Sequence, residues 1–324
     1  MAILYSRLRS PLFIEKTGSG STYLSADMTI TINSTVRYVL SKDTDSSYKV
    51  RYEISELLRD YLHITWDGLF PYSTDTKNSK VVTASLSTQF FTGTKEQRSQ
   101  GIGVAVGSAQ TDTVYGFDAY SDFSEGINKS ITTGALMQTN TTVYFSETLD
   151  GYIPFQSGTG IDYTTISAST SESTVTVGGT PVTIKRLCDP IHDVIRIIFV
   201  NKFGAFQEFY FTKKHSRGIS VSSEKFDNSI RSGMTYSVHD HKTNVYNKTG
   251  KERFTVNTDF LDDSQFEALK ELLLSELTWV QIGTAVIPIV ITTETLQKQT
   301  RINDSLVRYT IEFETSADLI NNIN

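Results

Sequence analysis

Apolar and polar residues alternate along much of this chain, which is the pattern of β-strands that bury one face. The clearest case is 306–313, where every second residue is apolar: Val307, Tyr309, Ile311 and Phe313. Similar patterns predict strands at 23–32, 36–40, 48–54, 81–91, 141–145 and 254–258. The nearly continuous apolar run at 193–200 predicts a central strand, and an aromatic strand at 206–211 returns beside it after a turn.

One segment, 263–277, has the spacing of a longer amphipathic helix. Its predicted apolar face consists of Phe266, Leu269, Leu273 and Leu277, with Ala268 and Leu272 beside it. Asp262 and Gln265 have the spacing of a capping box, so we expect them to start this helix. A second, shorter helix is predicted at 55–62, with Ser55 as its N-cap.

These elements predict a mainly β protein with antiparallel sandwich or barrel-like domains and one packed helix near the C-terminus. The length of 324 residues suggests two domains. We place an N-terminal β-rich domain at 1–185 and a C-terminal β domain at 186–324. The part from about 75 to 185 is rich in Thr, Ser and Gly, which predicts a loop-rich insertion. Within it, 157–180 is expected to reach a neighbouring copy, although the Gly178-Gly179 pair also predicts a hairpin turn.

Composition narrows the possible partners. A net charge of −6 gives no sign of general affinity for nucleic acid. Cys188 is the single cysteine, so no internal disulfide can form, and this fits folding in a reducing cytoplasm. The N-terminus does not have the pattern of a signal peptide. Apolar runs are far shorter than the ~18 residues of a membrane-spanning helix, so no membrane partner is expected.

Histidines and glycines give two weak signs of a site. His239 and His241 would share one face of a strand and could hold a metal ion, but no third ligand is evident nearby. A polar loop or exposed strand is the other interpretation of this segment. Gly101, Gly103 and Gly107 have the wrong spacing for a dinucleotide fingerprint and predict a flexible loop instead.

Charged residues do not form a recognisable catalytic motif. Asp259, Asp262 and Asp263 lack the spacing of a calcium-binding loop. The basic run 213–217 is either a solvated loop or a contact for DNA or an acidic partner. Cys188 has the character of an inert thiol. We therefore expect no catalytic residue, no cofactor, no metal and no enzymatic activity.

A resemblance to known proteins is carried by five segments: 10–14, 54–61, 199–207, 272–280 and 303–314. These segments resemble the tail or neck virion proteins, of ring or hub type, of crAss-like and related Bacteroidetes-infecting tailed bacteriophages. The resemblance implies a structural virion component, made in the host cytoplasm and assembled into a ring. DNA would pass through that ring, and neighbouring tail or connector proteins would bind it.

Two functions follow as hypotheses. The first is a ring or hub subunit that associates with itself as a hexamer or dodecamer through strand edges and loops. The second is a host-recognition spike or fibre component that binds carbohydrate, in which exposed Tyr and Trp side chains would form the sugar platform. An enzyme with unrecognised catalytic residues is a weaker third hypothesis.

Overall fold

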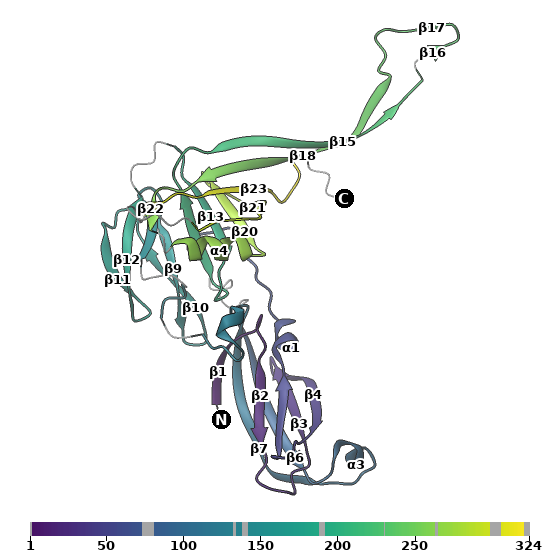
Figure 1. Ribbon diagram of the computed structural model, residues 1–324, viewed down its shortest axis with the longest axis vertical. Helices are drawn as coiled ribbons and strands as arrows, with labels where there is room; N and C mark the ends of the chain where they lie inside the picture. Colours follow the sequence, from purple (N-terminus) through teal and green to yellow (C-terminus); the bar gives the residue numbers. More distant parts are fainter. Residues whose placement is uncertain are drawn as a thin grey trace. The chain divides into compact units, whose positions relative to one another are not determined.

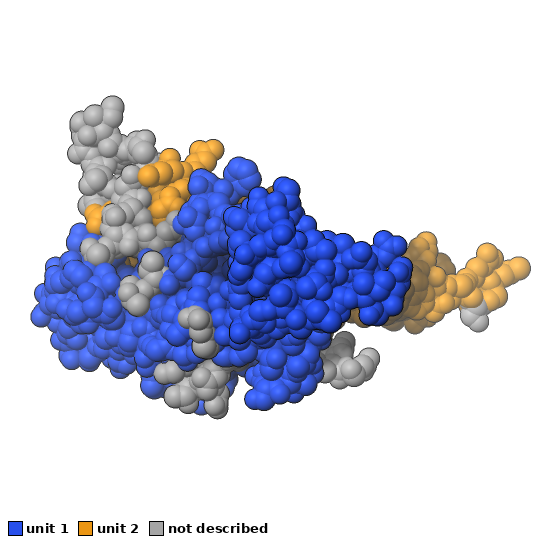
Figure 2. Space-filling model, turned by 90° about the horizontal axis from the view of Figure 1, so that it is seen from below, with its two compact units in different colours: residues 1–143, 150–185, 200–207 blue, residues 144–149, 186–199, 208–324 orange. Residues whose placement is uncertain are grey.

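The structure is a computed structural model that describes residues 2–72, 81–131, 134–137, 142–187, 192–229, 231–262, 265–298 and 306–320 (Figure 1). Its secondary structure is mainly β, with several antiparallel sheets and few helices, as the alternating pattern predicts. The chain divides into two compact units, coloured in Figure 2. Unit 1 comprises 1–143, 150–185 and 200–207, and unit 2 comprises 144–149, 186–199 and 208–324.

Unit 1 contains a five-stranded sheet in the order β1-β7-β6-β3-β4. Its strands are β1 (Ala2–Arg7), β3 (Ser25–Ile32), β4 (Thr35–Asp43), β6 (Val81–Phe91) and β7 (Ala105–Phe117). The first strand runs parallel to β7, and all other neighbours are antiparallel. The predicted strands at 23–32, 36–40 and 81–91 are therefore confirmed.

A second layer covers one face of this sheet. It consists of the antiparallel pair β2 (Phe13–Thr17) and β5 (Lys49–Glu53), followed by the short helix α1 (Ser55–Arg59). One hydrophobic cluster contains Ile14 and Tyr52 from this layer and Met28 and Leu86 from the sheet, all buried. Two sheet layers that share a core form a sandwich-like arrangement, as predicted. Ser55 is the first helical residue rather than the N-cap, a position that Ile54 occupies.

The region 75–185, expected to be rich in loops, contains long strands and buried side chains. Val82 and Leu86 of β6 and Phe117 of β7 are buried, while Ser and Thr occupy alternate positions of β6. The remaining elements of the region are the helix α3 (Lys95–Ser99), the 3₁₀ turn η1 (Phe123–Glu125) and the strands β8 (Thr142–Ser146), β9 (Gly151–Ser157), β10 (Gly160–Ile166), β11 (Ser173–Val177) and β12 (Thr180–Leu187). The polar composition of this region is therefore that of strands with one buried face and one solvent-exposed face.

Segment 157–180 contributes strands and buried side chains to unit 1, whereas an exposed arm was expected. Ile161, Ile166 and Val177 within it are all buried. The predicted hairpin is confirmed, because Val177 pairs with Thr180 across a two-residue turn. Gly178 and Gly179 in that turn have φ of 55° and 87°, the left-handed values that this hairpin turn requires.

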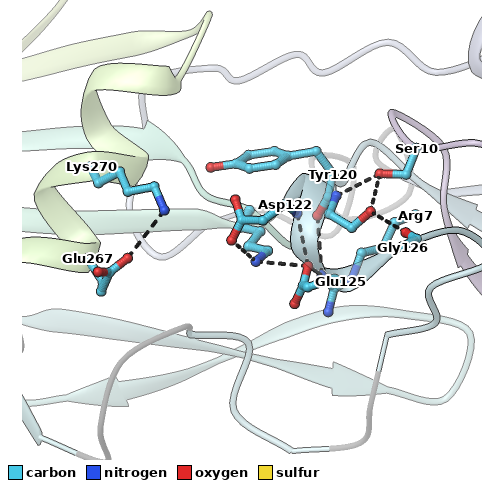
Figure 3. A network of polar contacts seen from close by, with 10 residues as sticks. Arg7, Ser10, Tyr120, Asp122, Glu125, Gly126, Glu267 and Lys270 are labelled. Atoms are coloured by element: carbon cyan, nitrogen blue, oxygen red, sulfur yellow. Dashed lines mark hydrogen bonds and ion pairs between the residues drawn. The ribbon is translucent and has the colours of Figure 1, made fainter.

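A charged network in unit 1 holds the turn at residues 201–205 (Figure 3). The buried Lys202 ammonium lies 2.7 Å from an Asp122 carboxylate oxygen and 3.0 Å from one of Glu125. Arg7 also contacts Glu125, at 3.3 Å. Burial is the largest single influence on Glu125 and would raise its pKa, but the hydrogen bonds from Lys202 and the Asp122 backbone, together with the charges of Lys202 and Arg7, outweigh it and the pKa is lowered. Burial likewise opposes the charged form of Lys202, but Asp122 and Glu125 raise its pKa.

Unit 2 is built on a seven-stranded sheet in the order β14-β13-β20-β21-β23-β18-β15. Its strands are β13 (Ile195–Val200), β14 (Phe206–Phe211), β15 (Ser216–Asp227), β18 (Thr243–Asn257), β20 (Thr278–Ile282), β21 (Ala285–Ile291) and β23 (Thr310–Thr315). Tyr309, Ile311 and Phe313 are buried as predicted. The predicted single strand 306–313 is interrupted, because β22 (Leu306–Val307) pairs with β19 (Leu261–Asp262) while β23 joins the main sheet.

The helix of unit 2, α4 (Phe266–Leu274), is shorter than the predicted 263–277. Its most buried apolar side chains are Ala268, Leu269 and Leu272, whereas Leu273 is only partly buried. Leu277 lies beyond the helix end. The predicted capping box is wrong: Asp262 belongs to β19, and Gln265 is the N-cap without a side-chain capping bond within the described residues. The buried stripe therefore keeps Leu269 of the predicted face and otherwise consists of the two residues that were predicted to lie beside it.

Candidate functional site: the hairpin arm of unit 2

The most prominent surface feature of unit 2 is a long two-stranded ribbon formed by β15 and β18 (Figure 1). Residues 253–257 of β18 pair with β23 on one side and, over 253–255, with β15 on the other. Residues 243–246, 249 and 250 of β18 pair with β15 but with no other described strand, and the register shifts between Ser222 and Glu224. The far end carries the short pair β16 (Arg231–Ser232) and β17 (Thr235–Tyr236). We refer to residues 219–250 as the arm.

The arm exposes apolar side chains on both of its faces. Odd-numbered residues of β15 share one face, where Ile219 and Val221 are 62% and 50% exposed. Phe226 lies on the opposite face and contacts Tyr246 edge-on, with ring centroids 5.6 Å apart. At the tip, Met234 is 97% exposed. A ribbon of two strands is at best marginally stable alone in water, so these exposed apolar side chains make the arm the candidate functional surface of unit 2.

The predicted basic run lies at the base of the arm, and acidic neighbours neutralise two of its cations. Lys213 lies 2.8 Å from an Asp259 carboxylate oxygen. Arg217 donates through two nitrogens to Glu252, and this hydrogen bonding raises the pKa of Arg217. Paired cations of this kind do not form the free basic patch that contacts with DNA phosphates require.

The two histidines considered for a metal site lie in a turn near the tip. His239 and His241 are exposed, and neither belongs to a strand, so the expected shared strand face does not exist. Within the described ranges, no group of three or more His, Cys, Asp or Glu side chains is arranged to hold a metal ion. Cys188 and Asp263 lie outside the described residues.

Two further residues considered in the sequence, Gly103 and Asp259, contribute to the local fold. Gly103 has a φ of 114°, and a Cβ there would meet the backbone nitrogen of Gly93 at 2.8 Å. This glycine therefore permits a close approach between two backbone segments. Asp259 accepts a hydrogen bond from the Phe260 amide as well as the ion pair from Lys213.

A pocket of about 460 Å³ also lies within unit 2. Its lining includes His215, Arg217, Phe254 and Gln281. Two buried atoms, His215 Nδ1 and Gln281 Oε1, have no hydrogen-bond partner among the described residues. The volume suits a small molecule. The lining does not show a nucleophile hydrogen-bonded to a base in the part of the chain that the structure describes.

The sequence patterns did not identify the arm. Its strands contain serines, glycine and charged residues beside few apolar ones, and the alternating pattern predicted no strand between 212 and 253. One sequence signal could have indicated the first strand of the arm: Ile219 and Val221 alternate with serines. Val245 is an apolar residue of the second strand.

Comparisons with known proteins do not indicate a function, so the geometry of the arm is the main evidence for one. No model of a known protein family matches the chain, and no curated protein matches it. Among the described residues, no helix has the length and apolar character needed to cross a membrane.

Proposed function

We propose that this chain is a structural subunit of a tailed-phage virion that assembles into a ring or hub of the tail or neck, through which DNA passes. The observation that carries the proposal is the arm, a ribbon with exposed apolar residues on both faces and at its tip. The resemblance of segments 54–61, 199–207, 272–280 and 303–314 to virion proteins supplies the biological setting. The partners are further copies of the chain and neighbouring tail or connector proteins.

Energetics support an assembly role for the arm. Ordering each backbone residue costs about 1–2 kcal/mol, which burial and hydrogen bonding must offset. The arm buries few side chains of its own, so contacts with a partner would supply the missing stabilisation. A net charge of −6 suits a wall that DNA passes without binding tightly.

The alternative, carbohydrate binding by a spike or fibre component, has less support in the geometry. The sugar platform of that hypothesis requires exposed aromatic rings. Trp66 is instead packed against Phe70, Tyr72 and Phe206, with ring centroids 5.4–5.5 Å apart. Its ring therefore belongs to an aromatic cluster of unit 1.

Native mass spectrometry and negative-stain imaging of the purified chain test the proposal. A hexameric or dodecameric ring is the expected result, and antibodies against the chain should label the tail or neck of purified particles. A trimer that binds glycans would support the spike alternative. Absence of the chain from purified virions would contradict the proposed function.

A further inference from the structure

The two edges of the seven-stranded sheet differ in their exposure. At one edge, every residue of β14 is buried. At the other edge, most of the twelve residues of β15 are exposed. Edge strands that stay unpaired are usually short or protected by proline or several charges. Among the described strands, none pairs with the outer edge of β15. β15 has no proline, and its four charged residues, Arg217, Glu224, Lys225 and Asp227, are of both signs, so this edge can accept a strand of complementary charge.

Symmetry limits which strand registers two copies of β15 can adopt. Two antiparallel copies related by a twofold axis perpendicular to the sheet keep the same face upward. Residues directly opposite each other must then share a face, so odd-numbered residues lie opposite odd and even opposite even. One of these registers places Ser222 of one copy opposite Ser222 of the other and pairs 217–227 of both copies.

The sequence of β15 is self-complementary in this register. Arg217, which binds Glu252 of its own chain but stays 61% exposed, lies opposite Asp227 at both ends. Opposite charges at such positions stabilise paired strands. Gly218 lies opposite Phe226, whose ring can cover the bare glycine. The register centred on Val221 instead places Arg217 opposite Lys225, a repulsive pair.

We propose that two copies of this chain associate through the free edges of β15, in antiparallel register about a twofold axis at Ser222. The interface joins the two seven-stranded sheets into one continuous sheet and covers Ile219 and Val221 with the aliphatic part of the partner's Lys225 and its neighbours. The inference does not rest on the virion proposal. In a dodecamer of two hexameric rings, twofold contacts of this kind would join the rings.

Cysteine cross-linking tests the register directly. In a chain carrying Cys188→Ser, the variant Ser222→Cys places two thiols opposite each other, with Cβ atoms roughly 4.5–5.5 Å apart, close to the geometry of a disulfide. The matched control is Ser220→Cys, on the same face of the same strand. It lies opposite Glu224, and its two thiols would be roughly 13 Å apart along the strands.

Under mild oxidation, Ser222→Cys should become a covalent dimer and Ser220→Cys should remain largely uncross-linked. Equal cross-linking of both variants, or of neither, would overturn the register. A chain that sediments as a monomer at all concentrations would overturn the interface. Because these outcomes concern purified protein, they are independent of whether the chain occurs in virions.

A charge reversal gives a second measurement. Asp227→Lys places a lysine opposite the partner's Arg217 at two symmetric positions, which should raise the dimer Kd roughly tenfold at low salt. It also removes the 2.7 Å hydrogen bond that Thr243 donates to Asp227. Thr243→Val removes the same hydrogen bond without the charge change, so its Kd should stay near that of the parent chain. Equal Kd values for Asp227→Lys and the parent would contradict the register.

Discussion

Gly204 lies in the turn between β13 and β14, where this turn packs against the backbone of Asp118. Its φ is 74°, and a Cβ would lie 2.8 Å from the Asp118 carbonyl oxygen. Gly204→Ala should therefore destabilise unit 1 by more than the ~1–2 kcal/mol of a left-handed alanine alone. The control is Gly283→Ala, with a φ of 62° and no atom within 4 Å of its Cβ. Equal losses in the two variants would contradict a steric role for Gly204.

The two tryptophans allow each unit to be followed separately. Trp66 belongs to unit 1 and Trp279 to unit 2. In a Trp279→Phe chain, fluorescence of Trp66 reports denaturant unfolding of unit 1, and Trp66→Phe leaves Trp279 as the reporter for unit 2. These parent chains serve the next three measurements.

Lys202→Met tests the charged network at neutral pH. Methionine keeps the apolar stem but leaves Asp122 and Glu125 without their shared cation. Removing one partner of a fully buried pair costs about 3–5 kcal/mol. Because these carboxylates are about a third exposed, at 30% and 34%, water can solvate them and we expect roughly 1–3 kcal/mol. An unchanged unfolding free energy of unit 1 would show that the network is not stabilising.

The same network should make the stability of unit 1 depend on pH. The folded pKa of Glu125 lies below its ordinary value of 4.5, so its contribution is complete above that pH and is lost as the pH falls through the folded pKa. The folded pKa of Lys202 lies above 10.5, so its contribution is complete below that value and is lost on further alkalinisation. The stability difference between the parent and Lys202→Met should narrow at both extremes. A constant difference would contradict this linkage.

At the scale of the element, α4 is held by the buried side chains of Ala268, Leu269 and Leu272. Leu269 is fully buried and Leu274 is 55% exposed. Leu269→Ala should lower the unfolding free energy of unit 2 by about 2–5 kcal/mol. Leu274→Ala should change it by less than ~0.5 kcal/mol, as surface substitutions do. Similar effects at both positions would show that the helix packs by another face.

At the scale of the whole molecule, the arm should be dispensable for folding and necessary for association. Replacing 223–248 with Asn-Gly joins Ser222 to Thr249, which already face each other across the ribbon. Both tryptophan reporters should show unchanged unfolding, and the oligomer should be lost in sedimentation. Retention of the full oligomer would show that the interface lies elsewhere.

The sequence by itself determined the local elements. Period-two alternation identified β3, β6 and the buried face of Tyr309, Ile311 and Phe313, because one wet face and one dry face impose that spacing. The Gly178-Gly179 turn was predictable because its backbone conformation disfavours other residues.

Only the tertiary structure decided features that depend on partners distant in sequence. The break between β22 and β23 follows from two different neighbouring strands, and the start of α4 follows from Asp262 joining β19. The partners of Lys202 lie about eighty residues earlier in the chain, and the exposure of β15 depends on its place at the sheet edge. The local pattern of apolar and polar residues indicates which side chains are buried. It does not indicate which segments pair, because strand pairs and ion pairs form between residues far apart along the chain.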